Sequence, residues 1–251
     1  MFLNLPGYQK RIRMKTERLI MSSEREKSEL LLREMGESLN LSHDNPYLFV
    51  RTGLIAKLFF YKELYEIIES VPGSIVEVGS WFGQSSILFE NIRAILEPFN
   101  YSRKIVSFDT FNGYKETSGL NIGSDEILKY QVGDDWLDLL GKIQGAHKSI
   151  NNSVSRFENV SGDIRETIPK YLEENSEPIA LVYYDIATYE TLKFTFSTLM
   201  PYISKGGVFV FDDYGYQYEG VNKFIIEHGI NKNYRLVHSK YYKSKVYLVV
   251  S

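Results

Sequence analysis

The chain has no cysteine and no apolar run long enough to cross a membrane. The missing cysteine excludes disulfide bonds, thiolate metal ligands and cysteine nucleophiles together. A membrane-spanning helix needs about 18 or more consecutive apolar residues, and the early apolar run Leu19–Met21 is also too short for the core of a signal peptide. We therefore expect a cytoplasmic protein with no membrane partner.

An excess of basic charge is also missing. Lysine and arginine number 29 against 32 aspartates and glutamates, which gives a net charge of −3. Proteins that bind nucleic acid through its phosphates usually present a positive field, so we expect no nucleic-acid partner. What the chain does have is 43% hydrophobic residues over 251 positions, enough for one large domain with an appendage.

Residues 1–72 differ in pattern from the rest of the chain. Apolar residues at helical spacing predict helices over residues 23–35 and 52–70, and Pro72-Gly73 ends the second helix. We interpret residues 1–72 as an N-terminal helical extension. Its early basic cluster could be an anion or partner site, but we favour a solvated arm or an oligomer contact.

From residue 73 to 251, strand and helix patterns alternate, which is typical of a doubly wound α/β domain with a mainly parallel sheet. Gly206-Gly207 is expected to form a tight turn before the fifth strand. A lysine-rich turn joins the last two strands into an antiparallel hairpin. The seven predicted strands are Ile75–Val78, Lys104–Phe108, Arg156–Val160, Ile179–Tyr184, Val208–Phe211, Tyr234–His238 and Lys245–Val250.

Carboxylates stand where two of these strands end. Asp185 follows the strand Ile179–Tyr184, and Asp212 and Asp213 follow Val208–Phe211. Ligands of such sheets collect at the carboxyl ends of the strands, so three carboxylates would meet at one rim and repel one another unless a cation lay between them. A hard divalent cation such as Mg²⁺ is the natural candidate. The alternative, in which Asp212 only caps a turn, leaves the adjacent Asp213 unexplained.

The first strand leads into a turn that begins at Gly79 and ends at Gly83. Glycine lets the backbone approach a ligand closely, and the amides at the following helix N-terminus would face a polar group, with Ser85 or Ser86 as the cap. The second strand ends at Asp109, which could accept hydrogen bonds from both hydroxyls of a ribose. Each feature alone could be a turn or a cap, but together they favour a ligand site.

Residues 112–135 contain four glycines and show no clear periodicity. A loop of this length inside a compact domain is usually a lid or a binding segment. We expect it to close over the site and exclude water.

Several blocks resemble a known family. Glu77-Val78-Gly79, Asp109, Gly162-Asp163 and Asp185, in that order on the first four strands, resemble class I S-adenosylmethionine-dependent methyltransferases. More narrowly, the chain is similar to the macrocin O-methyltransferase family, which methylates sugar hydroxyls of macrolides and related natural products. The blocks that carry this resemblance are Val76–Gly83, Gly162–Pro169, Tyr189–Thr191, Leu199–Val208 and Asp212–Gly215. It covers roughly residues 50–250.

The resemblance implies S-adenosylmethionine and Mg²⁺ as cofactors, and a homo-oligomer, as in related enzymes. Asp109 would hold the ribose, Phe111 would lie near the adenine, and Asp163 with Ile164 would address the adenine edge. The implied cofactor-binding set is Glu77, Val78, Gly79, Ser80, Gly83, Ser85, Asp109, Thr110, Phe111, Gly162, Asp163, Ile164 and Asp185. Asp185, Asp212 and Asp213 would bind Mg²⁺, with Asp185 and Asp212 as the catalytic pair.

One position departs from the family. The family usually reads Asp-x-Asp-x-Tyr-Glu where this chain has Asp185-Ile186-Ala187-Thr188-Tyr189-Glu190. The second Asp, replaced here by Ala187, is thought to deprotonate the accepting hydroxyl. Metal coordination lowers the pKa of a hydroxyl, so Mg²⁺ could suffice, or His147 or Tyr216 could act as the base.

Three functions are compatible with a doubly wound fold that has a glycine turn and an acid at the end of the second strand. The favoured one is a Mg²⁺-dependent O-methyltransferase that acts on a hydroxyl of a sugar, glycoside or related natural product. The alternative is a methyltransferase-fold binding or scaffold protein that keeps the cofactor pocket but lacks turnover, as Ala187 would allow. A nicotinamide-dependent oxidoreductase would need a Gly-x-Gly-x-x-Gly motif that is absent, and it would leave Asp212-Asp213 unexplained.

Overall fold

The computed structural model of the chain describes residues 24–38, 45–113, 130–133, 135–151, 156–215 and 220–251. The chain divides into two compact units, Met1–Lys57 and Leu58–Ser251. The first unit contains helix α2 (Glu24–Ser38), which corresponds to the helix predicted over residues 23–35. A short 3₁₀ helix, η2 (Pro46–Leu48), follows it. Helix α3 (Thr52–Ile68) contains the boundary between the units.

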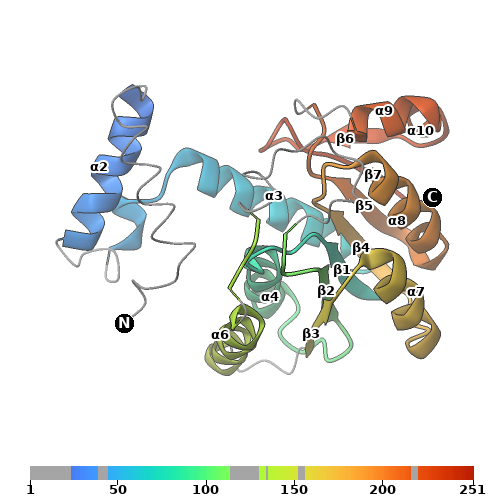
Figure 1. Cartoon of the computed structure of the whole chain (residues 1–251), viewed down its shortest axis with the longest axis horizontal. Coiled ribbons are helices and arrows are strands. Elements are labelled where there is room, and N and C mark those ends of the chain that lie inside the picture. Colours follow the sequence, from blue (N-terminus) through green and yellow to red (C-terminus); the bar gives the residue numbers. More distant parts are fainter. Residues whose placement is uncertain (1–23, 39–44, 114–129, 134, 152–155, 216–219) are drawn as a thin grey trace. The chain divides into compact units, whose positions relative to one another are not determined.

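The second unit is built on a seven-stranded sheet with helices on both faces (Figure 1). The strand order is β3-β2-β1-β4-β5-β7-β6; the first five are parallel, and β7 runs antiparallel to both β5 and β6. The predicted doubly wound sheet and its terminal antiparallel hairpin are therefore confirmed. The strands are β1 (Ser74–Val78), β2 (Lys104–Asp109), β3 (Arg156–Ser161), β4 (Ile179–Tyr184), β5 (Ile203–Phe211), β6 (Leu236–His238) and β7 (Val246–Val249).

The central strands place apolar side chains on both faces of the sheet, since successive side chains point to opposite faces. In β4, for example, Val182 belongs to the core under α7, α8 and α9, whereas Leu181 belongs to the core under α3 and α4. The second unit therefore folds as three layers. The helices of this unit after α3 are α4 (Gln84–Leu96), α6 (Trp136–Ile150), α7 (Ile164–Glu174), α8 (Tyr189–Leu199), η4 (Met200–Tyr202), α9 (Gly220–Glu227) and α10 (Ile230–Asn233).

The predicted turn at Gly206-Gly207 is wrong, because both residues lie inside β5. The pairing of β5 with β4 is irregular between Ile179 and Leu181, and Gly206 has φ +84°. A Cβ on Gly207 would lie 2.6 Å from the Ile203 side chain. The two glycines thus allow the strand to be irregular here, where the side chain of another residue would be strained or would clash.

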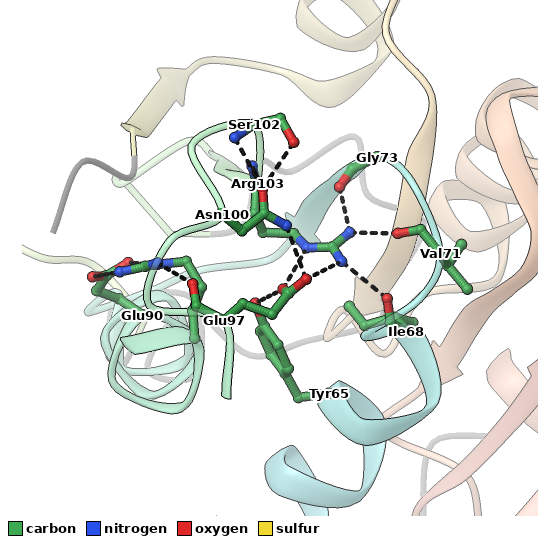
Figure 2. Close-up of polar contacts among 10 residues, drawn as sticks. Tyr65, Ile68, Val71, Gly73, Glu90, Glu97, Asn100, Ser102 and Arg103 are labelled. Atoms are coloured by element: carbon green, nitrogen blue, oxygen red, sulfur yellow. Dashed lines mark hydrogen bonds and ion pairs between the residues drawn. The ribbon is translucent and has the colours of Figure 1, made fainter. Parts of the chain in front are cut away.

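At the amino ends of β1 and β2, the buried guanidinium of Arg103 joins three segments (Figure 2). It donates to the backbone carbonyls of Ile68 (2.9 Å), Val71 (2.8 Å) and Gly73 (2.6 Å), and also to both carboxylate oxygens of Glu97. Carbonyls at a helix C-terminus have no partner within the helix. Arg103 therefore satisfies the end of α3 and fixes the path of the chain into β1.

Candidate active site

The predicted site residues lie at one edge of the sheet. Each stands at, directly after or within a few residues of the carboxyl end of β1, β2, β3, β4 or β5, and these five strands are neighbours in the sheet. Because the strands are parallel, their carboxyl ends share one rim. The structure therefore brings the two predicted groups, the glycine turn with Asp109 and the three aspartates, to the same rim.

Asp109 is held by two backbone amides. Its Oδ2 accepts from the Trp81 N–H (2.7 Å) and its Oδ1 from the Phe111 N–H (2.7 Å). Trp81 and Phe111 both have left-handed backbones, with φ of +50° and +51°. Such a conformation costs a non-glycine residue roughly 1 kcal/mol or more, and the charge-assisted hydrogen bonds to the carboxylate help to offset it. Each oxygen keeps a second lone pair for a ligand hydroxyl.

Glu77 is a buried acid in β1, and among the described residues only one of its two carboxylate oxygens has a hydrogen-bond partner. Oε2 accepts from the Ser107 hydroxyl (3.1 Å), whereas Oε1 has no hydrogen-bond partner among the described residues. Burial raises the pKa of Glu77, and neighbouring serine hydroxyls partly offset that effect. A buried polar atom without a partner is costly, so a donor group of a bound cofactor fits this position.

The two glycines of the β1–α4 turn are required by packing. Gly79 has φ +94°, and a Cβ there would lie 2.5 Å from the Asp185 carbonyl oxygen. At Gly83, which has φ +73°, a Cβ would lie 2.6 Å from Leu140 Cδ1 of α6. The turn is therefore pressed between the start of the segment after β4 and helix α6, at the position where a ligand would meet its amides.

The predicted serine cap of α4 is wrong. Gly83 is the N-cap, and no side chain caps this helix end. Ser86 donates its hydroxyl back to the Gly83 carbonyl (2.8 Å), and Ser85 accepts from the Tyr61 hydroxyl (2.9 Å). Neither Ser85 nor Ser86 therefore accepts a hydrogen bond from the amides at this helix end. Ser85 is instead part of the buried contact with α3.

The predicted adenine-edge residues begin α7. Asp163 is the N-cap of this helix and accepts from the Arg165 N–H (3.0 Å), and its carboxylate also pairs with the Arg165 guanidinium (2.7 Å). Ile164 belongs to the core. Gly162 donates its N–H to the Asp109 carbonyl (3.0 Å), which joins the end of β3 to the end of β2. The contact of Asp163 with adenine stays a prediction.

Aromatic side chains line the rim beside Asp109. The Trp81 ring lies 4.6 Å from Phe82 and 5.6 Å from Tyr130, and Phe82 lies 4.8 Å from Trp136, between ring centroids. Trp81, Phe82 and Trp136 pack on a small core that includes Phe111. This cluster supplies an apolar wall next to the carboxylate predicted to hold the ribose. Thr110, in the same turn, donates to the Gly113 carbonyl (2.7 Å).

The three predicted metal ligands come together. Asp185, Asp212 and Asp213 each offer a carboxylate oxygen, and these oxygens all lie within 4.8 Å of one another. Burial, together with the charge of Asp212, raises the pKa of Asp213 to about 6, although Lys245 partly offsets the effect. Three oxygen donors at this spacing, destabilised by their mutual repulsion, fit a hard divalent cation such as Mg²⁺.

Two residues that the sequence patterns did not single out hold Asp212 in place. The buried Tyr183 hydroxyl donates to Asp212 Oδ1. Lys245 Nζ pairs with Asp212 Oδ2 and donates to the Asp212 backbone carbonyl (2.7 Å). The signal for Lys245 is the strand register: Phe211 pairs with Val246, so the next positions are Asp212 and Lys245. That register is not readable from the hairpin pattern alone.

The segment that departs from the family is buried. Ala187 is in the core, and a Cβ on Gly220 would collide with its carbonyl oxygen, so the start of α9 lies directly against it. Of the bases considered, His147 lies in α6 with Nδ1 3.4 Å from Asn91 Oδ1 of α4. It stands eleven residues beyond Trp136, roughly 16 Å along the helix, and so away from the rim. Tyr216 lies outside the described residues, as does most of the predicted lid (114–129 and 134).

The strand order, the terminal antiparallel hairpin and the acids at adjacent strand ends define a class I methyltransferase fold. A comparison with protein families places the chain more narrowly. The family model for macrocin O-methyltransferase (TylF) matches residues 40–241. The chain belongs to this family of S-adenosylmethionine-dependent O-methyltransferases.

Relatives agree with this assignment. The crystal structure of CalS11, a calicheamicin methyltransferase, is similar with a TM-score of 0.81 and 28% identity, over 91% of this chain and 93% of that one. A second, apo structure of CalS11, described as a TDP-rhamnose 3'-O-methyltransferase, has a TM-score of 0.75 and 27% identity over 91% and 95% of the two chains. The O-methyltransferase NovP, at 20% identity and a TM-score of 0.61 over 78% and 80%, shares the fold.

A curated relative from Streptomyces olivaceus is 25% identical over 150 residues. It is 8-demethyl-8-(2,3-dimethoxy-alpha-L-rhamnosyl)-tetracenomycin-C 4'-O-methyltransferase. The alignment spans 59% of this chain and 55% of that protein, so this chain matches little more than half of the relative's length. Among the described residues, no helix combines the length and apolarity that crossing a bilayer requires.

Proposed function

We propose that the protein transfers a methyl group from S-adenosylmethionine to a hydroxyl of a sugar, a glycoside or a related natural product, with Mg²⁺ as its metal. The observation that carries this proposal is the convergence of Asp185, Asp212 and Asp213 within 4.8 Å at the rim that also holds Asp109. Membership of the macrocin O-methyltransferase family supports it.

The cofactor side of the rim would bind the nucleoside. Asp109, oriented by two amides, would accept from the ribose hydroxyls, and Phe111 with the aromatic cluster would cover the adenine. The free Oε1 of Glu77 would accept from a donor on the methionine part. S-adenosylmethionine supplies an electrophilic methyl on sulfonium, and Mg²⁺, when bound, lowers the pKa of a neighbouring hydroxyl.

Asp185 joins the two sides. It follows β4, which lies between β1 and β5, and its carbonyl contacts Gly79 closely while its carboxylate faces Asp212 and Asp213. The residues proposed to hold the cofactor and those proposed to hold the metal are therefore neighbours at Asp185. The contribution of the protein is to hold the acceptor hydroxyl in line with the methyl group, which can account for a large part of a transfer rate. The hydrophobic wall beside the pocket would help to exclude water.

For the acceptor, we propose a rhamnose-type sugar, either activated as a nucleotide or attached to an aglycone. CalS11 is described as acting on TDP-rhamnose, and the Streptomyces olivaceus relative on a rhamnosyl group of a tetracenomycin. The cytoplasmic location, the homo-oligomer and the lack of nucleic-acid and membrane partners stay predictions.

A binding or scaffold protein without turnover is the second candidate, and Ala187 in place of the family's acid favours it. The two candidates share the cofactor pocket and differ in product formation. We would first titrate S-adenosylhomocysteine by calorimetry with and without MgCl₂. Absence of binding in both conditions would overturn the methyltransferase proposal.

The second step tests turnover. TDP-rhamnose and a rhamnosylated aglycone would be incubated with S-adenosylmethionine, and the products examined by mass spectrometry for a gain of one methyl group, with EDTA as the metal-free arm. A methylated product that requires Mg²⁺ supports the proposal. Cofactor binding without product from any sugar of the panel would favour the scaffold.

A further inference from the structure

Lys245 places a partly buried positive charge against the acid cluster. Its side chain is only 13% exposed, and its ammonium contacts both a carboxylate oxygen and the backbone carbonyl of Asp212. It also lies 5.3 Å from the centroid of the Tyr242 ring. The residue stands directly before β7, and its position opposite Asp212 follows from the antiparallel pairing of Phe211 with Val246.

Lys245 offsets only one of the three negative charges that the rim carries without a metal. Asp185, Asp212 and Asp213 carry three negative charges when ionised, and Lys245 returns one positive charge. The net charge of −2 that remains equals the charge a single divalent cation would neutralise.

We propose that the Lys245 ammonium is the resident cation of the acid cluster: it holds the three carboxylates together when no metal is bound and weakens the binding of a divalent cation by occupying Asp212 and adding like charge. This inference rests on the metal site of the proposed function. It assigns Lys245 as a positioning residue that acts through Asp212.

Two effects of Lys245 on metal affinity oppose each other. As a donor to Asp212, Lys245 orients the carboxylate of a proposed metal ligand, which raises the metal affinity. As a unit positive charge beside the site, it repels the metal. The charge effect should dominate, because Tyr183 donates independently to the other oxygen of Asp212 and keeps that carboxylate oriented when the lysine is removed.

The test measures Mn²⁺ affinity of the full chain, with Mn²⁺ as the probe and electron paramagnetic resonance as the readout. We compare the wild type with Lys245→Met, Lys245→Gln and Lys245→Arg. Lys243→Met is the matched control, because Lys243 lies two residues away in the same turn and is exposed. Loss of the charge should tighten Mn²⁺ binding about tenfold or more, while Lys245→Arg and Lys243→Met stay within about threefold of the wild type.

A second readout uses thermal unfolding in EDTA. Lys245→Met and Lys245→Gln should both unfold at a lower temperature than the wild type without metal, and saturating Mn²⁺ should raise their midpoints more than it raises that of the wild type. Unchanged or weaker Mn²⁺ binding by the charge-removing variants would overturn the inference. Using two variants separates loss of charge from a packing defect of either side chain.

Methyl transfer is assayed separately. If Mn²⁺ binding changes as expected but no sugar is methylated, the proposed function fails and the role of Lys245 stands. If neither the wild type nor any variant binds Mn²⁺ while methylation proceeds in EDTA, the role of Lys245 and the metal site fail, and the methyltransferase function stands.

Discussion

The hydroxyl of Tyr183 donates to Oδ1 of Asp212 from inside the protein core. The Tyr183 ring is stacked on Tyr61 at 5.1 Å between centroids, and Tyr61 donates to Ser85 in the first turn of α4. The orientation of a proposed metal ligand is thus set by the packing of β4 against α3 and α4. The same packing supports the turn at which the cofactor is expected.

Tyr183→Phe should weaken Mn²⁺ binding by roughly three- to tenfold and cost about 1–2 kcal/mol in metal-free stability, because a buried carboxylate oxygen loses its donor. The matched control is Tyr61→Phe, which removes an equally buried hydroxyl that binds Ser85 instead. Calorimetric titration and urea unfolding measure the two quantities. Equal Mn²⁺ affinity in both variants would contradict a positioning role for Tyr183.

Asp109→Asn should weaken S-adenosylhomocysteine binding about 30-fold or more, because an amide has only one acceptor oxygen and cannot serve both backbone amides and the ribose. The affinity for Mn²⁺ should change little. Asp138→Asn, at an exposed position in the first turn of α6, is the control. A cofactor affinity equal to that of the wild type would place the ribose elsewhere.

Gly79→Ala should destabilise the protein by about 2–4 kcal/mol, since an added Cβ meets the Asp185 carbonyl and the backbone is left-handed. It should also weaken Mn²⁺ binding by displacing Asp185. Gly141→Ala in α6 is the control: nothing lies within 4 Å of its Cβ, and alanine in a helix is expected to stabilise by about 0.5–1 kcal/mol. Similar unfolding midpoints for the two variants would show that Gly79 is not under steric constraint.

Glu97→Gln should make stability less dependent on pH. Burial alone would raise the pKa of Glu97, but hydrogen bonds from Arg103, Tyr65 and Asn100 outweigh it and lower the pKa. A carboxyl group with a lowered folded pKa adds stability above its unfolded pKa of about 4.3, and this stability is lost as the pH falls through the folded pKa.

The variant should therefore be less stable than the wild type by about 2–4 kcal/mol at pH 7, and the difference should shrink toward pH 3. Urea unfolding at a series of pH values measures it. Glu66→Gln, which removes an exposed pair with Lys62, should change stability by less than about 1 kcal/mol at any pH. A difference for Glu97→Gln that is constant from pH 7 to 3 would rule out this role of the carboxylate.

Most of the architecture was readable from local pattern. Buried strands such as Ile179–Tyr184 are continuous apolar runs, so this strand was predicted with the bounds observed. The local pattern failed at a pair of glycines, because paired glycines occur both in turns and in irregular strands. Gly206 and Gly207 look like a turn, yet they lie within β5, because the sheet needs an irregularity there.

The sequence by itself determined which acids would stand at the ends of which strands, since a buried strand and the polar residue after it are adjacent in the chain. Their convergence followed from a parallel sheet. Only the tertiary structure decided what holds them: Tyr183 and Lys245 reach Asp212 from 29 and 33 residues away. Those contacts depend on the register of β5 with β7 and on which face of β4 is buried under α3, and such long-range pairings leave no mark in the local pattern.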